Sequence, residues 1–226
     1  MSESEHQPGF GDTVDLLKQV GCAFHQRGWV MGTSGNFSVV TSHRPLRVTI
    51  TSSGADKGSL SARDLLQIDE EGQVAQGSGS PSAETLLHLA VIRWREAGSI
   101  LHTHSVWSTL LSKAYAREGG ISIEGYEMLK GLEGITTHEH CEWLPIFENS
   151  QDVPRLSERV AQTLTRHPSA HGFLLEGHGL YSWGANVTEA QRHIEILEFL
   201  IELLCRTHGS GLGVEPLTDS QFSDIA

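Results

Sequence analysis

The sequence predicts an α/β fold, a single layered domain in which a central, mostly antiparallel β-sheet is flanked by helices. The 226 residues fit one domain of ordinary size that can bury a sizeable core. Helix-spaced apolar stretches mix with short alternating stretches, without the strict strand-helix-strand rhythm of a parallel sheet. No internal repeat or long linker divides the chain. Residues 1–226 are therefore expected to form one domain, with loose tails at about 1–11 and 210–226.

The first part of the chain is expected to supply two helices separated by strands and turns. The expected elements are a helix over 13–27, a turn-rich segment over 31–38, strands over 47–51 and 65–68, and a helix from 80 to about 97. Gly28 follows the first helix and ends it. Ser80 is expected to cap the second helix, with Pro81 at its first position, because proline is tolerated where no intrahelical N–H bond is needed.

The second part is expected to alternate strands and helices more closely. The expected elements are strands over 99–104, 143–147, 172–175 and 179–183, and helices over 106–114, 153–165 and from 188 to about 209. Pro145 argues for an edge position of its strand, because proline cannot donate to a neighbouring strand. Thr188 and Gln191 have the spacing of a capping box, which predicts the start of the last helix.

Composition and charge exclude several classes of protein. Lys and Arg number 16 against 28 Asp and Glu, so the formal net charge of −12 disfavours a nucleic-acid partner. Three widely spaced cysteines indicate no disulfide framework and fit a reducing cytosol. The polar N-terminus lacks the pattern of a signal peptide, and glutamates interrupt the most apolar stretch, 194–205. We therefore expect a cytoplasmic protein without a membrane span.

Three of the 13 histidines form the sharpest candidate for a metal site. His102 and His104 lie two residues apart at the end of an expected strand, so both imidazoles project from one face. Paired imidazoles suit a divalent zinc-like ion, and a catalytic site usually has a third protein ligand. His178 is the first choice for that ligand, because glycines on both sides leave its ring accessible. Without a third ligand, two strand histidines bonded to carbonyls would explain the pair as well.

Other histidines offer weaker candidates. His138 and His140 repeat the same spacing next to Glu139 and Cys141, but they lie in an expected loop that does not hold them on one face. A solvated polar loop is the favoured interpretation there, although a loop can bring ligands together. His88 lies four residues after Glu84 on the expected second helix and is interpreted as a hydrogen-bonded surface or core histidine.

Two glutamates and two turns are candidates for acid/base chemistry and anion binding. Glu84, expected in the first turn of its helix, and Glu127, in a glycine-flanked segment, could each act as a general base near a metal. The turns 34–38 and 51–54 offer small residues, hydroxyls and backbone N–H groups that bind anions without net positive charge. Lys57 is a candidate counter-charge for a phosphate held there.

The order of these motifs is more specific than any one of them. Gly-Asn-x-Ser at 35–38, Thr-x-Ser-Gly at 51–54, Pro-Ser-x-Glu at 81–84, His-x-His at 102–104 and Gly-His-Gly at 177–179 together resemble the class II (zinc-dependent) aldolase superfamily. The resemblance spans roughly residues 14–205. Within it, the runs 123–131 and 175–184 are similar to a dehydratase branch that acts on a phosphorylated ketose in methionine salvage.

The resemblance implies a role for each matching position. It implies one zinc ion per subunit, held by His102, His104 and His178. Glu127 matches the acid/base glutamate of the dehydratases, and Glu84 matches the catalytic glutamate of the aldolases. The phosphate loops match at Gly35, Asn36, Ser53 and Gly54, with Ser82 as a weaker addition. Members are typically cyclic tetramers with active sites at subunit interfaces, so a homotetramer is expected.

Two alternatives stay open. A sugar-phosphate aldolase or 4-epimerase would use the same zinc and phosphate loops and would predict C–C cleavage. The run Glu127–Gly131 favours the dehydratase, although the presence of Glu84 leaves the division of labour open. A metal-free scaffold like the head domain of adducin would be expected to lose the three histidines, and all three are present here.

Overall fold

The computed structural model describes residues 10–209, so the expected tails lie outside the described residues, except that Phe10 and Gly11 already belong to the first helix. The helices of the described chain are α1 (Phe10–Gln26), α2 (Thr85–Arg95), α3 (Val106–Ala114), α4 (Val153–Arg166) and α5 (Val187–Gly209). The strands are β1 (Asn36–His43), β2 (Leu46–Thr51), β3 (Leu65–Ile68), β4 (Val74–Gln76), β5 (Ser99–Thr103), β6 (Gly120–Ile123), β7 (Glu142–Phe147), β8 (Gly172–Leu175) and β9 (Gly179–Gly184). Short 3-10 turns are η1 (Lys57–Ser59), η2 (Ala62–Asp64), η3 (Ala116–Glu118) and η4 (Glu127–Gly131).

The strands of the described chain form one sheet in the order β4-β3-β2-β1-β5-β9-β8-β7-β6. Every pairing is antiparallel except that of β7 with β8. The prediction of an α/β domain with a central, mostly antiparallel sheet is therefore confirmed. Strand β5, at whose end the His-x-His motif lies, is in the middle of this sheet between β1 and β9.

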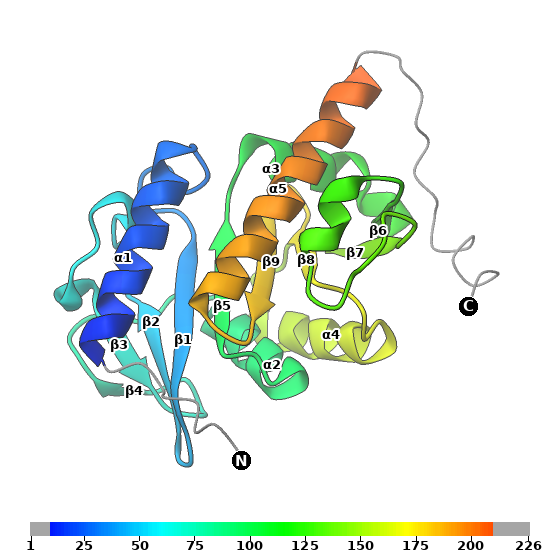
Figure 1. Ribbon diagram of the computed structural model, residues 1–226. Helices are drawn as coiled ribbons and strands as arrows, with labels where there is room; N and C mark the ends of the chain where they lie inside the picture. The colour runs from blue at the N-terminus through cyan, green and yellow to red at the C-terminus, as the bar shows by residue number, and fades with distance from the viewer. Residues whose placement is uncertain (1–9, 210–226) are drawn as a thin grey trace, which may run out of the picture.

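Helices cover both faces of the sheet (Figure 1). Side chains of α1, α3 and α5 form one buried core with Leu101 and Leu180, and side chains of α2 and α4 form a second core with Ile100 and Tyr181. Neighbouring residues of one strand thus enter different cores, because successive side chains of a strand point to opposite faces. His102 follows Ile100 by two residues and shares its face.

Most expected elements are present, and the strands that were not expected are β1, β4 and β6. Helix α3 and strand β3 have the predicted bounds, and α1, α4 and α5 agree within a few residues. Strand β1 begins at Asn36, inside the segment expected to be only turn-forming. The glycine and serine residues around its start are typical of a turn, yet β1 pairs with β2 on one side and with β5 on the other. Tertiary pairing overrides local propensity here.

Pro145 does not mark an edge strand, so that prediction is wrong. Strand β7 lies between β8 and β6, and β6 forms the edge. The Ile146 N–H donates to Gly119 on the β6 side, so the Pro145 nitrogen faces the β8 side. The ladder with β8 pairs only Ile146 with Leu174 and Phe147 with Leu175, so no bond is lost at the proline.

Both predicted helix starts are displaced. Helix α2 begins at Thr85, because Pro81 is held in a β-bridge with Ser52 before the helix forms. Helix α5 begins at Val187, before the expected capping box. The Asn186 side chain accepts a hydrogen bond from the Glu189 N–H at 3.0 Å, and that pair caps the helix instead of Thr188 and Gln191.

The three cysteines are free thiols and form no disulfide with one another. Among residues 10–209, no helix combines the length and the apolar character that crossing a bilayer requires.

Candidate metal centre

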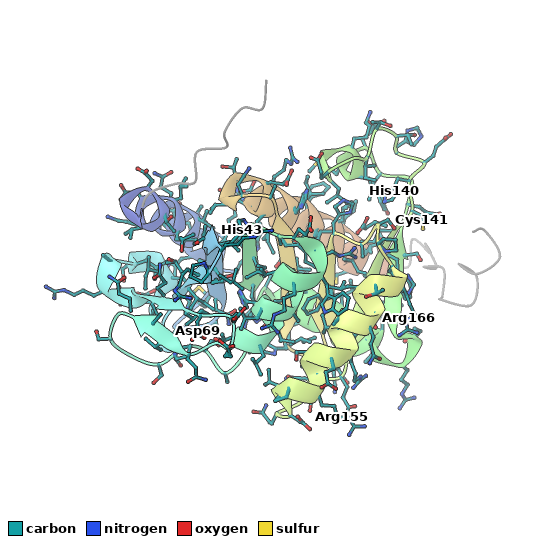
Figure 2. All side chains as sticks on the ribbon, turned by 90° about the horizontal axis from the view of Figure 1, so that it is seen from below. His43, Asp69, His140, Cys141, Arg155 and Arg166 are labelled. Carbon is teal, nitrogen blue, oxygen red and sulfur yellow. The ribbon has the colours of Figure 1, made fainter. Side chains whose placement is uncertain are left out.

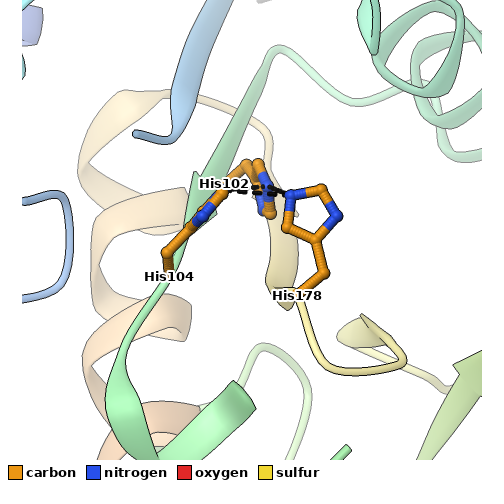
Figure 3. Close-up of side chains that lie close together, drawn as sticks. All are labelled: His102, His104 and His178. Carbon is orange, nitrogen blue, oxygen red and sulfur yellow. Dashed lines mark hydrogen bonds between the residues drawn. The ribbon is translucent and has the colours of Figure 1, made fainter. Parts of the chain in front are cut away.

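Three imidazoles converge at the end of strand β5. His102 lies in β5, His104 follows its last residue, and His178 lies in the turn between β8 and β9 (Figure 3). The Nε2 atoms of His102 and His104 are 2.8 Å apart, and the Nε2 atom of His178 is 3.3 Å and 3.2 Å from them. A neutral imidazole has only one N–H, so three ring nitrogens that all face one point are the arrangement expected around a cation.

Strand pairing brings His178 to the other two histidines. Strands β5 and β9 are antiparallel, and His102 lies opposite Tyr181. The β8–β9 turn must pass very close to β5 to deliver His178. A Cβ atom at Gly179 would lie 2.0 Å from the Thr103 carbonyl oxygen, so only glycine permits this approach.

The environment fixes the protonation of His102 and His104. His102 is fully buried, and its Nδ1–H donates to the Leu180 carbonyl oxygen at 2.9 Å, which leaves the Nε2 lone pair facing the other rings. Burial, followed by the neighbouring imidazoles, places the pKa of His102 well below its ordinary value. Burial also lowers the pKa of His104 to about 4. Both rings are neutral near neutral pH, as metal ligation requires.

Glu84 lies directly beside the three histidines. Its Oε1 atom is 3.2 Å from His178 Nε2, and its Oε2 atom is 3.7 Å from His102 Nε2. Glu84 occupies the position before α2 and makes no side-chain cap bond, so the expectation that it lies in the first helical turn is wrong. The displaced helix start leaves this carboxylate free to face the histidines.

A buried hydrogen-bond chain holds Glu84 in place. The Asn36 amide nitrogen donates to Glu84 Oε2 at 2.7 Å, and the Asn36 amide oxygen accepts from His88 Nε2. The Ser38 hydroxyl donates to His88 Nδ1 at 2.7 Å. Burial lowers the pKa of His88 to about 3, so His88 is a neutral structural link. Of the two interpretations offered for His88, the hydrogen-bonded core histidine is confirmed.

The expected phosphate loops line one cavity with His104 and Glu84. This cavity has a volume of about 170 Å³. Its lining includes the expected phosphate-binding residues Gly35, Asn36, Ser53, Gly54, Lys57 and Ser82. The two turns that resemble each other in chemistry therefore face one space, next to the histidines.

Lys57 joins the two turns from below the surface. Its side chain is buried, and its ammonium donates to the carbonyl oxygens of Thr33 at 2.9 Å and Ala55 at 2.6 Å. Burial lowers the pKa of Lys57 to about 8. An ammonium has three donors, so one remains for an anion in the cavity.

Glu127 lies apart from the other site residues. It is exposed in η4, outside the lining of the cavity. It forms an ion pair with Lys130, and its Oε1 atom lies 3.5 Å from His138 Nδ1. The hydrogen bond from Lys130 lowers the pKa of Glu127, so the carboxyl is ionised near neutral pH. The structure therefore brings together every predicted site residue except this glutamate.

Sequence reasoning missed a carboxylate behind the His-x-His segment. Glu198 of α5 is buried and accepts hydrogen bonds from the hydroxyls of Thr103 and Ser105, the residues on either side of His104. Burial raises the pKa of Glu198 to about 7. Glu195, Glu198 and Glu202 look alike in sequence as a polar helix face, so no local signal distinguishes the buried one.

The donor set fits a divalent ion. A tetrahedral ion with bonds of about 2.0–2.1 Å to nitrogen places its ligand atoms about 3.3 Å apart. The three Nε2 atoms lie 2.8, 3.2 and 3.3 Å apart, close to that value. Imidazoles without a thiolate suit zinc and also other divalent transition metals. His102, His104 and His178 can hold such an ion, with Glu84 at the open side.

The sequence is similar to a known family of proteins. Residues 16–205 match the family model described as Class II Aldolase and Adducin N-terminal domain. The chain is 42% identical to methylthioribulose-1-phosphate dehydratase of Methylococcus capsulatus, over 90% of this chain and 98% of that protein. It is 47% identical to the protein of the same name from Xanthomonas campestris pv. campestris, over 78% of this chain and 80% of that protein.

Solved structures share the fold at lower identity. An L-fuculose 1-phosphate aldolase superposes with a TM-score of 0.76 at 21% identity, covering 99% of this chain and 98% of that chain. The L-fuculose-1-phosphate aldolase of Thermus thermophilus superposes with a TM-score of 0.72 at 24% identity, covering 92% and 100%. The chain belongs to the class II aldolase and adducin N-terminal domain family.

Proposed function

We propose that this chain is a methylthioribulose-1-phosphate dehydratase, a lyase of methionine salvage that removes water from the phosphorylated ketose to give 2,3-diketo-5-methylthiopentyl 1-phosphate. The observation that carries the proposal is the placement of three converging imidazoles beside a cavity lined by the two turns that hold the expected phosphate-binding residues. Relatives of this name match the chain at 42–47% identity.

The metal of this centre is proposed to be zinc, with one ion per subunit held by His102, His104 and His178. A bound divalent ion would supply Lewis acidity toward the substrate carbonyl. The two turns and Lys57 are proposed to bind the phosphate. Because the phosphate is remote from the bonds that change, its binding energy mainly serves to position the sugar. Glu84, held by Asn36, lies where it contacts the substrate or the metal.

Glu127 is proposed as the acid/base residue. Its carboxylate takes the proton from the carbon next to the ketone. The hydroxyl one carbon further along leaves as water, and the same carboxylic acid returns the proton to it. Because Glu127 lies outside the cavity of its own subunit, we propose that it acts in the site of a neighbouring subunit of a homotetramer.

Exposed apolar side chains support such an interface. Val106 and Leu110, one turn apart on α3, are 73% and 54% exposed, and helix α3 starts two residues after His104. Met128, beside Glu127, is 40% exposed. Apolar surface of this kind next to a site is typical of a subunit contact. The three unpaired thiols favour the cytoplasm as the location.

The reaction assay tests the function directly. Incubation with methylthioribulose 1-phosphate is expected to release water without aldehyde fragments, and a chelator is expected to stop the reaction. A Glu127→Gln variant should keep its metal and lose turnover by about 100-fold or more. Glu124→Gln, an exposed neighbour, is the matched control and should keep turnover. Full turnover in metal-loaded Glu127→Gln would refute the assignment of the base.

Mixed oligomers test the shared site. Glu127→Gln and His178→Ala are each expected to be inactive alone. A mixture that is dissociated and reassembled should regain part of the activity, because some sites then combine an intact Glu127 with an intact set of histidines. No recovery in mixed tetramers would contradict the proposal that neighbouring subunits share a site.

A second candidate is a sugar-phosphate aldolase or 4-epimerase. The position of Glu84, 3.2 Å from His178, favours it, because the glutamate at this position is the one the aldolase resemblance implies to be catalytic. The same assay distinguishes the two, since an aldolase would release dihydroxyacetone phosphate and an aldehyde from a sugar phosphate.

A further inference from the structure

The two histidines of the second His-x-His motif, His138 and His140, have different partners. His138 is 52% exposed and faces Glu127, whereas His140 faces Glu142 at the start of β7. His140 and Cys141, labelled in Figure 2, directly precede β7. The loop therefore separates the two histidines and directs one of them toward the sheet.

His140 joins a carboxylate and a third histidine. The Nε2 atom of His140 and the Nδ1 atom of His171 each lie 2.9 Å from Glu142 Oε2. The three ligand atoms lie within 4.8 Å of one another. The Glu142 side chain is only 1% exposed, while those of His140 and His171 are 18% and 13% exposed. A buried carboxylate with two imidazoles thus lies within reach of solvent.

The surroundings orient these groups as they orient metal ligands. The Nε2–H of His171 donates to the Glu133 carbonyl oxygen at 2.9 Å. A neutral His171 then carries its lone pair on Nδ1, the nitrogen that faces Glu142. Histidines that ligate a metal usually donate their other N–H to a carbonyl or carboxylate in this way. The backbone N–H of His171 donates to Glu142 Oε1 at 2.8 Å, which fixes the carboxylate as well.

We propose that His140, Glu142 and His171 form a second divalent-cation site, distinct from the centre at His102. Two imidazoles and one carboxylate are a donor set that binds zinc-like ions, with a fourth position left for water. The competing arrangement has no cation, and His171 is then doubly protonated between the Glu142 carboxylate and the Glu133 carbonyl.

The position of the cluster in the sheet indicates what a cation would do there. Glu142 opens β7 and His171 directly precedes β8. These strands form the parallel pair of the sheet, and their ladder joins only residues 146–147 to 174–175. The cation would connect the two strands at the end where the ladder is absent, and through Glu133 it would also hold the segment that follows η4. The role of the site is structural, and it does not depend on the proposed function.

Metal counting on the full-length protein tests the proposal. The protein is stripped with a chelator, dialysed against micromolar Zn²⁺, and analysed for metal per chain by mass spectrometry. Wild type should bind two ions, and His140→Ala should bind one. His138→Ala, which changes the other histidine of the same motif, should still bind two. His178→Ala should bind one, because it removes the first centre and keeps the second.

Two further measurements separate loss of the ion from loss of the fold. Glu142→Gln keeps the size of the side chain and an acceptor for the His171 N–H, so it carries the test if His140→Ala is not folded by circular dichroism. Zinc should raise the melting temperature of His178→Ala and leave that of the His140→Ala/His178→Ala double variant unchanged. One ion in saturated wild type, or two ions in folded His140→Ala, would overturn the proposal in favour of the hydrogen-bonded triad.

Discussion

Tyr181 stacks on the imidazole of His102, with ring centroids 3.8 Å apart and an interplanar angle of 11°. Phe173 stacks on the other side of Tyr181 at 4.7 Å and 7°, so a column of three rings positions this histidine. The Tyr181 hydroxyl is buried near the Glu84 carboxylate, and burial, followed by Glu84, raises the pKa of Tyr181 well above its usual value.

The stack predicts different results for two substitutions of Tyr181. Tyr181→Phe should keep the metal and leave the affinity for Zn²⁺ nearly unchanged, because it keeps the ring that stacks on His102. Tyr181→Leu should weaken metal binding by about tenfold, because the His102 ring loses its support. Isothermal titration with Zn²⁺ measures both, and equal affinities in the two variants would contradict a positioning role for the stack.

Gly35→Ala should be far more damaging than Gly28→Ala. Both glycines have a positive φ, 72° and 74°, so alanine pays a similar backbone cost of about 1–2 kcal/mol at each. A Cβ atom at Gly35 would also lie 2.6 Å from the His102 carbonyl oxygen, whereas at Gly28 it would meet nothing within 4 Å. Denaturant unfolding should therefore show a larger loss of stability for Gly35→Ala, accompanied by weaker metal binding. Equal losses would show that the contact with His102 is unimportant.

Lys57 should make the use of the phosphorylated substrate pH-dependent. Burial lowers its pKa to about 8, so the ammonium is charged below that pH and neutral above it. The value of kcat/KM should fall as the pH rises through about 8. Lys57→Met should raise KM by roughly tenfold near pH 7 and abolish this decline. A decline that persists unchanged in Lys57→Met would assign it to another group.

Glu198 should make the protein less stable as the pH rises. Its pKa is raised by burial from 4.5 to about 7, so the folded state binds more protons than the unfolded state between these values. Stability should then decrease from about pH 4.5 to 7, by up to roughly 3 kcal/mol. Glu198→Gln stays neutral and should melt at a higher temperature than wild type at pH 8, with a smaller difference at pH 5.

Glu195→Gln is the control for Glu198 on the same helix. Glu195 is 33% exposed and paired with Arg27 at 2.9 Å, so its substitution should change stability little across this pH range. A wild-type stability that does not fall between pH 5 and 7 would contradict the raised pKa of Glu198.

The sequence predicted the elements whose signals are local. Helix α3 has its predicted bounds because the Ser105 hydroxyl caps it and accepts from the Ser108 N–H at 2.9 Å. Strand β1 was missed because its neighbours in the sheet define it. The prediction of an edge strand from Pro145 is wrong for a similar reason. Proline is excluded from inner strands because it lacks an N–H donor, but the ladder of β7 with β8 starts only after Pro145, so no donor is needed there.

In the candidate site, too, the sequence predicted the residues that local spacing relates and missed those that only the fold brings together. His102 and His104 are related by strand spacing, which the sequence displays directly. The partners that hold the site lie far away in sequence. His88 and Glu198 act from inside the two cores, and nothing in their local sequence reveals burial. The separation of His138 from His140 likewise depends on a loop that only the folded chain defines.

The strand order links metal affinity to the integrity of the whole fold. His102 and His178 are 76 residues apart in sequence, but His102 lies on β5 and His178 in the turn that leads into the neighbouring strand β9. Strand β1, from the first part of the chain, pairs with the other side of β5. A polypeptide cut anywhere between His104 and His178 would leave each fragment with an incomplete set of ligands. Bound metal is therefore a reporter of cooperative folding, and its release during denaturation should coincide with the loss of the entire sheet.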